Sequence, residues 1–296
     1  MKILAIIVSY NFERWLERCL SSLINSEHPI DILVIDNASK DHTTQRIKTD
    51  YPQVRLIESS TNLGFGRANN LGMQLAIKEN YDAVFLINQD ARINNDTIGT
   101  LATLCQKYTD YGIVSPTHLT GSGDKLDPGF ETYLQSAKTA KEKDILDAPF
   151  INAAFWMIPV SILQIVGGFC PLFYHYGEDK DYINRIHYHG YKVGYSSQVS
   201  GCHDREYRPV SHQQFLRTEY VYHLSEYVNI NHSFCVAFGY GVFALVKKCL
   251  IALCQGKGKL SGEFLTMSFR LLMKSRSVYN YRRQNKLSQP NYIQPV

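Results

Sequence analysis

The sequence predicts an α/β fold in which a mostly parallel central sheet is flanked by helices and followed by a helical C-terminal extension. Over the first 115 residues, short apolar segments alternate with amphipathic helical segments. Strands that are apolar on both faces are typical of a parallel sheet covered by helices. The 296 residues, 45% of them hydrophobic and 20% charged, have an ordinary globular composition, which excludes a disordered chain.

The first strand is expected over residues 3–8, a run of six apolar side chains that ends at Ser9. This run is short and no small-residue cleavage site follows it, so we interpret it as a buried strand and not as a signal peptide. Residues 12–25 follow as a helix, because their apolar side chains recur at helical spacing on one stripe.

The next two units repeat this pattern. Residues 31–35 form a second apolar strand, and Asp41 or Thr43 is placed to cap the short helix that follows. Residues 54–58 form a third strand, and a glycine-rich loop then opens a helix that reaches about residue 79.

The second half of the chain is less regular. A fourth strand over residues 83–87 and a helix over 96–108 complete the alternating pattern. The elements expected after them are a strand over 113–115, a polar surface loop over 120–147, strands over 149–159 and 191–199, and a helix over 178–189. Beyond Arg208 the chain is expected to be helical and rich in aromatic residues.

Charge is distributed unevenly along the chain. Residues 1–150 carry a net charge of −4 and residues 151–296 a net charge of +8, with ten basic residues and one acidic residue from Lys247 onward. Such a basic tail indicates binding to an anionic surface, either lipid headgroups or phosphate. The alternative is a solvated terminus, which has the same composition.

An uncharged segment over residues 234–246 precedes Lys247 and Lys248. It is shorter than the roughly 20 apolar residues that a spanning helix needs. We therefore expect an interfacial amphipathic helix with its lysines at the headgroup level, the alternative being a helix packed on the core.

The seven cysteines are scattered and never spaced C-x-x-C. This pattern predicts a reduced, cytoplasmic protein in which most cysteines are small core residues.

Polar clusters follow the predicted carboxyl ends of the first four strands. They contain Ser9 and Asn11, Asp36 and Asn37, residues 62–69, and residues 88–90. Open α/β sheets bind ligands at this edge, so we expect these clusters to converge on one crevice.

Three of the polar side chains suggest chemistry. Asp90 follows a buried strand. Its carboxylate could bind a divalent cation that bridges to a diphosphate, or it could simply cap the turn that follows. Asp179 lies among the carboxylates of residues 178–181 at a helix start and could act as a general base, with only one of Asp179 and Asp181 facing the cleft. His203 is either a metal ligand or an ordinary surface histidine.

Residues 64–69 resemble half of a dinucleotide fingerprint but lack its third glycine and follow the third strand. This disfavours a Rossmann dehydrogenase. Close approach of the backbone at Gly64 to a phosphate or sugar remains open, with Arg67 as a charged donor.

Taken together and in order, five segments resemble those of family 2 glycosyltransferases, particularly the bacterial rhamnosyltransferase-like branch. They are residues 6–11, 34–39, 62–72, 86–91 and 167–185. The resemblance implies a GT-A fold in which residues 1–115 bind a nucleotide sugar, residues 116–233 bind the acceptor, and residues 234–296 form a basic helical extension.

The resemblance also implies roles for individual residues. Asp90 matches the last carboxylate of the D-x-D metal motif, whose first position here is Asn88, and His203 matches a downstream metal ligand. Asp179 matches the catalytic base. The donor-binding residues would be Ser9, Asn11, Asp36, Asn37, Gly64, Arg67 and Asn88.

The function that follows is inverting transfer of a sugar from dTDP-rhamnose or a UDP-sugar, with Mg²⁺ or Mn²⁺, to a hydroxyl of a glycan or lipid-linked saccharide. The enzyme would act in cell-surface polysaccharide synthesis at the inner face of the membrane, without a nucleic-acid partner. The alternative is a non-catalytic scaffold that binds a sugar nucleotide, which Asn88 favours because it stands where the metal motif has an acid. A sugar-phosphate nucleotidylyltransferase is disfavoured because residues 9–12 lack its basic glycine-rich loop.

Overall fold

The computed structural model describes residues 1–134, 143–205 and 209–293. A central nine-stranded sheet has the strand order β3-β2-β1-β4-β8-β6-β9-β5, and β7 pairs with β9 beside this path. The strands are β1 (Ile3–Ser9), β2 (Asp31–Asp36), β3 (Arg55–Glu58), β4 (Ala83–Asn88), β5 (Ala91–Ile93), β6 (Tyr111–Thr120), β7 (Leu146–Asp147), β8 (Phe155–Pro159) and β9 (Lys192–His203).

The parallel pairing that the sequence predicts holds for the first four strands, β3-β2-β1-β4. Beyond β4 the sheet is mixed. Strand β8 runs antiparallel to both β4 and β6, β6 and β9 are parallel, and β5 and β7 run antiparallel to β9.

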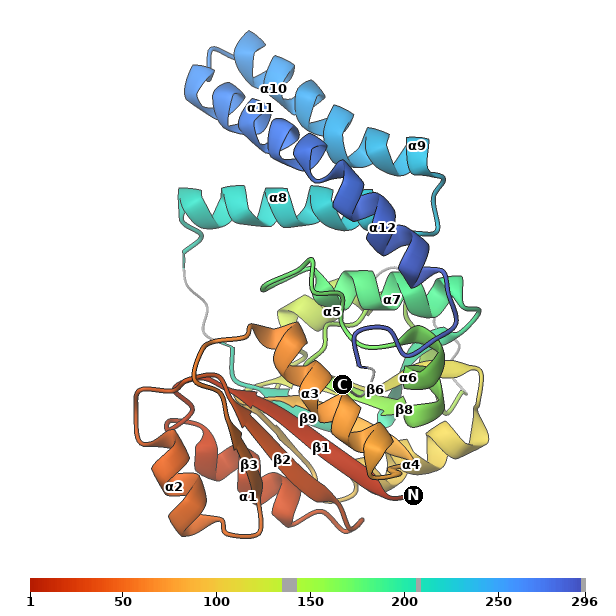
Figure 1. Cartoon of the computed structure of the whole chain (residues 1–296). Coiled ribbons are helices and arrows are strands. Elements are labelled where there is room, and N and C mark those ends of the chain that lie inside the picture. Colours follow the sequence, from red (N-terminus) through yellow and green to blue (C-terminus); the bar gives the residue numbers. More distant parts are fainter. Residues whose placement is uncertain (135–142, 206–208, 294–296) are drawn as a thin grey trace.

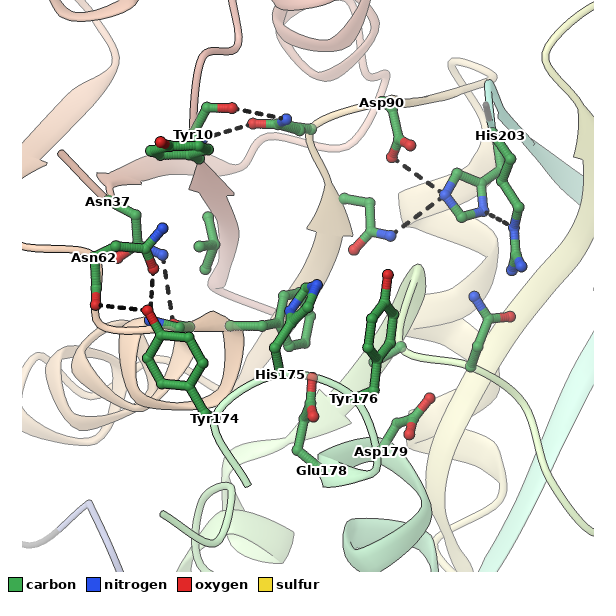
Figure 2. A pocket seen from close by; sticks show the side chains of 18 of the residues that line it. Tyr10, Asn37, Asn62, Asp90, Tyr174, His175, Tyr176, Glu178, Asp179 and His203 are labelled. Carbon is green, nitrogen blue, oxygen red and sulfur yellow. Dashed lines mark hydrogen bonds and ion pairs between the residues drawn. The ribbon is translucent and has the colours of Figure 1, made fainter. Parts of the chain in front are cut away.

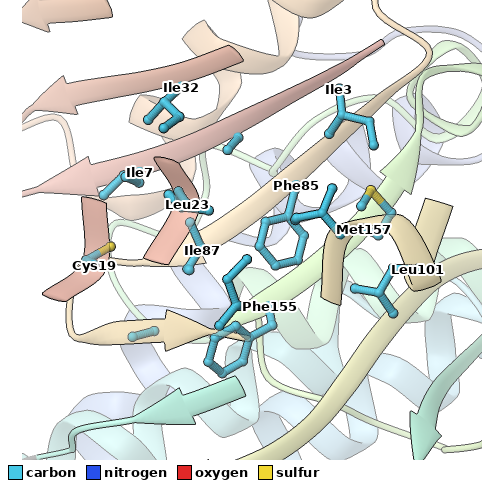
Figure 3. Close-up of a cluster of buried hydrophobic side chains, with 14 of the residues drawn as sticks. Ile3, Ile7, Cys19, Leu23, Ile32, Phe85, Ile87, Leu101, Phe155 and Met157 are labelled. Carbon is cyan, nitrogen blue, oxygen red and sulfur yellow. The ribbon is translucent and has the colours of Figure 1, made fainter. Parts of the chain in front are cut away.

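Helices cover both faces of the sheet (Figure 1). One face packs against α1 (Leu16–Ile24), α2 (Thr43–Asp50) and α4 (Thr97–Lys107). The other packs against α3 (Phe65–Lys78), α5 (Pro128–Leu134), α6 (Val160–Val166) and α7 (Glu178–Tyr188). Alternate side chains of β1 enter the two cores: Ile3 and Ile7 join the first (Figure 3), whereas Leu4 and Ile6 join the second.

The segment over residues 120–147 is more ordered than the surface loop expected from its polar sequence. Strand β6 continues to Thr120, α5 follows, and β7 ends the segment, while residues 135–142 lie outside the described part. Phe130 anchors α5 because its side chain is fully buried in the core on the face of the sheet that carries α3, α6 and α7. His203, expected in a loop, is the last residue of β9.

The C-terminal helices form a separate layer above the sheet domain (Figure 1). They are α8 (His212–Val228), α9 (Phe234–Phe238), the π-helical turn η1 (Gly239–Phe243), α10 (Ala244–Cys254), α11 (Gly258–Met273) and α12 (Ser275–Asn285). Helix α8 shares a third core with them, in which Tyr227 packs with Ala237 and Leu245. Helices α10 and α11 form a hairpin on the far side of α8.

Helices α9, η1 and α10 form one continuous helix, Phe234–Cys254, of 21 residues with a mean hydropathy of 1.8. By length and composition it could cross a membrane, a test that the core helix of a soluble protein also passes. The helix is longer than the uncharged segment over residues 234–246, because it continues through Lys247 and Lys248 to Cys254.

After α12 the chain returns to the sheet domain. The Gly168 amide donates to the Asn291 carbonyl over 2.8 Å, and Ile293 is buried in the core with α3 and α6. These contacts tie the helical layer to the sheet domain in addition to the packing of α8 on α7.

Candidate active site

A cavity of about 780 Å³ lies at the carboxyl edge of the sheet, a volume in the range of small-molecule sites. Its polar lining residues are Tyr10, Asn37, Asn62, Asn88, Gln89, Asp90, Tyr133, Asn152, Tyr174, His175, Tyr176, Glu178, Asp179, His203, Arg205 and Arg217. Figure 2 shows Asp90 and His203 on one side of it, Asn37, Asn62 and Tyr174 on another, and Glu178 and Asp179 beneath.

The polar clusters at the strand ends converge as predicted. The Gln89 amide after β4 accepts from the Tyr10 backbone N–H after β1, over 2.8 Å. Ser9 Oγ donates to Asp36 Oδ1 over 2.8 Å, which joins the ends of β1 and β2. Segments remote in sequence therefore meet at one edge.

Asp90 and His203 form one corner of the cavity. Asp90 Oδ1 lies 3.2 Å from His203 Nε2, and Asn88 Nδ2 lies 3.3 Å from the same nitrogen. Strand β5 holds this corner together, because Ala91, next to Asp90, pairs with His203 across the antiparallel ladder.

The contact with Arg205 bears on which ring nitrogen of His203 carries the proton. The Arg205 Nε–H donates to His203 Nδ1 over 3.1 Å, and a guanidinium can only donate. This contact favours the tautomer that carries its proton on Nε2, facing Asp90, whereas the Asn88 amide nitrogen beside Nε2 favours the other tautomer. A neutral ring that ligates a cation through Nε2 would carry its proton on Nδ1, and the donated contact from Arg205 opposes this tautomer.

The residues present fit a cation that is shared with a substrate. Asp90 offers a carboxylate and His203 an imidazole, whereas the described residues hold no group of three or more His, Cys, Asp or Glu side chains that could bind a metal by themselves. A divalent cation here therefore needs further oxygen ligands, such as those of a diphosphate.

Arg205 was not identified from the sequence, although it lies two residues after His203. Its guanidinium forms an ion pair with the fully buried Asp127 over 3.0 Å and also lines the cavity. Asp127 in turn accepts from the Phe130 backbone N–H at the start of α5. The arginine is thereby held at the cavity wall as a positive charge.

Helix α7 presents its first turn to the cavity. Gly177, at a φ of +87°, precedes Glu178 and Asp179, which both line the cavity. Burial, and then the neighbouring Asp179, raises the pKa of Glu178 to about 7. Burial also raises the pKa of Asp179, while the Lys180 backbone N–H, bonded to Oδ1 over 2.8 Å, opposes this shift.

Asp181 has a structural environment. Its carboxylate is fully buried and pairs with Arg185 one turn later over 2.9 Å. Arg185 also donates to the carbonyls of Val166 and Gly168. Of Asp179 and Asp181, only Asp179 lines the cavity.

An aromatic loop over residues 174–176 and helix α8 complete the cavity wall. Tyr174 Oη donates to the Asn62 carbonyl over 3.2 Å, and the Arg217 guanidinium lies 5.6 Å from the centre of the Tyr176 ring. Both contacts join remote segments, and no local motif in the sequence signals them.

Of the residues proposed from the sequence, Asn37, Gly64, Asn88, Asp90, Asp179 and His203 line the cavity. The other four, Ser9, Asn11, Asp36 and Arg67, do not line it. Both Asp36 oxygens accept bonds from Ser9 and Ser39 behind the wall. Asn11 accepts from the Lys40 backbone N–H, and Arg67 reaches the Pro171 carbonyl.

Comparison with known proteins identifies the family. Residues 4–166, more than half of the chain, match the sequence profile of Glycosyl transferase family 2. The chain belongs to this family. This family 2 glycosyltransferase is 26% identical over 226 residues to the low-salt glycan biosynthesis hexosyltransferase Agl10 of Haloferax volcanii, covering 73% of this chain and 71% of the relative.

A second relative is the N-acetylglucosaminyl-diphospho-decaprenol L-rhamnosyltransferase of Mycobacterium tuberculosis. It is 24% identical over 244 residues, which cover 70% of this chain and 78% of the relative. Together with the family profile, these relatives confirm the resemblance and the enzyme class predicted from the sequence.

Solved structures confirm the GT-A fold of this glycosyltransferase. S. aureus TarS in complex with UDP superimposes with a TM-score of 0.56 at 15% identity, covering 97% of this chain and 90% of that chain. The mannosyltransferase PcManGT of Pyrobaculum calidifontis, in complex with GDP-Man and Mn²⁺, superimposes with a TM-score of 0.54 at 16% identity, covering 99% and 84%.

Proposed function

We propose that this family 2 glycosyltransferase is an inverting hexosyltransferase that uses Asp179 as its general base. The observation that carries the proposal is the placement of Asp179 on the same cavity as the Asp90–His203 corner. An acceptor hydroxyl could give its proton to Asp179 as its oxygen attacks the anomeric carbon, while the bond to the diphosphate breaks on the Asp90 side. One base and one leaving-group site suit a single displacement with inversion.

Asp90, His203 and Asn88 would hold Mg²⁺ or Mn²⁺ together with the donor diphosphate. The bound cation would neutralise the charge that develops on the leaving nucleoside diphosphate. Arg205 would add a second positive charge on the same wall and help to neutralise the leaving diphosphate.

The proposed donor is dTDP-rhamnose or a UDP-sugar, and the acceptor is a hydroxyl of a lipid-linked saccharide in cell-surface polysaccharide synthesis. One relative is named for rhamnosyl transfer to a lipid diphosphate saccharide, and TarS has been crystallised with UDP and with UDP-GlcNAc. Ser9, Asn11, Asp36, Asn37, Gly64 and Arg67 are proposed to support the donor-binding side. A cytoplasmic location at the inner membrane face follows for an enzyme that joins a nucleotide sugar to such an acceptor.

The base assignment predicts the outcome of Asp179→Asn. This change keeps the shape of the side chain and removes its proton acceptor, so the turnover number should fall about 10²–10⁴-fold. Donor affinity, measured by calorimetry, should stay near that of the unmodified enzyme.

Asp181→Asn is the matched control on the same helix. It breaks a buried ion pair and should lower stability by about 3–5 kcal/mol, seen as a lower melting temperature, without a comparable effect on the turnover of the folded fraction. If Asp179→Asn spares turnover, the inverting-transfer proposal fails, and a sugar-nucleotide-binding scaffold explains the cavity better.

The cation site predicts the outcome of Asp90→Ala. Mn²⁺ should no longer stimulate donor turnover in this variant, and Mn²⁺ should no longer raise the affinity for a nucleoside diphosphate. Full Mn²⁺ dependence in the variant would remove Asp90 from the site. Asp96→Ala, on a solvent-exposed turn before α4, is the control carboxylate and should leave both measurements unchanged.

A further inference from the structure

The α10–α11 hairpin carries an exposed apolar face that the catalytic cavity does not use. Its large side chains are between 45% and 69% exposed. We call this face the hairpin platform; it consists of Phe243, Leu250 and Leu253 with Leu265, Phe269, Leu272 and Met273. Contiguous exposed apolar patches of this kind mark interaction sites in soluble proteins.

The contacts of the hairpin fix the direction of the platform. Lys248 of α10 pairs with Glu219 of α8, and Glu263 of α11 pairs with His212 of α8. Leu250 and Leu265 each follow one of these residues by two positions, which places them on the opposite side of their helices. The platform therefore faces away from α8, on the outer side of the hairpin.

The two helices hold the platform as one rigid surface. Cys249 Sγ lies 3.2 Å from Ser261 Oγ, and Ser268 Oγ donates to the Val242 carbonyl over 3.1 Å. Leu250 and Leu253 are three residues apart on α10, and Leu265 and Leu272 are seven apart on α11, so the members on each helix lie on one face.

Basic side chains lie on the two helices of the hairpin and at their ends. They are Lys247 on α10, Lys257 and Lys259 at the hairpin turn, and Lys274 and Arg276 at the other end. Each cation close to an anionic lipid surface contributes about 1 kcal/mol of binding, and apolar side chains inserted between headgroups add to it.

We propose that the hairpin platform docks this enzyme on an anionic bilayer, with α10 and α11 lying in the interface. This inference rests on the proposed function for the lipid-linked nature of the acceptor. The platform shares Phe243 with the segment over residues 234–246, whereas Ala237, Val242 and Leu245 of that segment are buried in the helical layer.

Docking in this orientation places the cavity above the lipid surface. Helix α8 contacts the hairpin through Glu219 and lines the cavity through Arg217. Two layers of packed helices, at 8–10 Å each, amount to roughly 20 Å. The saccharide end of a lipid-linked acceptor could reach the cavity at this height while its lipid stays in the bilayer.

The test is sedimentation of the full chain with vesicles of phosphatidylcholine and phosphatidylglycerol at a molar ratio of 70:30. The unmodified protein should bind, and Leu250→Glu combined with Phe269→Glu should weaken binding at least tenfold without changing the melting temperature. Leu287→Glu changes a residue that is 54% exposed beyond α12 and should bind as the unmodified protein does.

Several results would contradict the proposal that the hairpin platform docks on a bilayer. Equal binding by the platform variant, or complete loss of wild-type binding in 0.5 M NaCl, would exclude insertion of the apolar face. Resistance to carbonate extraction would show that Phe234–Cys254 spans the bilayer instead. A lipid-free dimer that the platform variant dissociates, without vesicle binding, would assign the face to a second copy of the chain.

Donor turnover in lipid-free solution separates this inference from the proposed function. The platform variant should retain it, since the platform lies outside the cavity. Lack of turnover in the unmodified protein would count against the proposed function, whereas the vesicle result would still decide the platform.

Discussion

Glu178 is a carboxylate in a buried position, where its charged form is destabilised by the loss of solvent. Its side chain is 5% exposed, its Oε2 has no hydrogen-bond partner among the described residues, and its pKa is raised to about 7 by burial and by Asp179. Carboxyl groups with raised pKa values are typical of functional sites, where a residue needed for activity can lower the stability of the fold.

This environment predicts that Glu178→Gln stabilises the protein in a pH-dependent way. Because the pKa is raised on folding, the stability linked to this carboxyl is present below its unfolded pKa of about 4.5 and is lost as the pH rises through 7. The variant should be more stable by up to about 3 kcal/mol at pH 8, and the difference should vanish towards pH 4.5.

Thermal unfolding of both proteins at pH 4.5, 6 and 8 would measure this difference. A gain that is equal at every pH would show that packing, and not ionisation, causes it. Glu131→Gln, an exposed glutamate on α5, is the matched control and should show little pH-dependent gain.

At the level of the elements, the turn before α3 depends on Gly64. Its φ is +81°, and a Cβ placed there would lie 2.2 Å from the Tyr174 carbonyl oxygen. The close approach brings the donor-side loop against the aromatic loop over residues 174–176, and both line the cavity.

Gly64→Ala should therefore destabilise the protein and weaken donor binding. Gly190→Ala provides the control, because Gly190 has a φ of +84° but no atom within 4 Å of an added Cβ. The control should lose about 1 kcal/mol from backbone strain alone. Gly64→Ala should lose more and raise the dissociation constant of the donor, measured by calorimetry. Equal losses, with donor affinity unchanged, would show that the contact with Tyr174 is unimportant.

The first four strands and their helices could be predicted because each carries a local signal. An apolar run such as residues 3–8 forms a strand by its own pattern, and polar residues at its end mark the ligand-binding edge of the sheet. Asp90 and Asp179 could be proposed because their motifs are short and contiguous.

The rest of the cavity depends on contacts that sequence patterns do not record. Arg217 reaches the cavity because α8 packs across it, and Asp127 holds Arg205 because α5 packs on the same face of the sheet as α7. The hidden position of Asp36 follows from its bonds to Ser9 and Ser39, which compete with any ligand for its oxygens.

For the whole molecule, the sheet domain and the helical layer share one site. Lys180 of α7 pairs with Glu226 of α8 over 2.5 Å, next to the turn that presents Asp179. The layer that carries the hairpin platform thus also supplies Arg217 and borders the catalytic turn. A movement of this layer on a membrane would therefore shift Arg217 and the first turn of α7 at the cavity.

The return of the chain to the sheet domain has a consequence for biosynthesis. Ile293 fills part of the core beside α3 and α6, and Asn291 bonds to Gly168, although the sheet itself is complete at His203. A ribosome that has translated residues 1–203 has therefore made every strand but still lacks this side chain. The nascent sheet domain must wait for about 90 further residues, several seconds at bacterial or eukaryotic rates, with apolar surface near Gly168 uncovered.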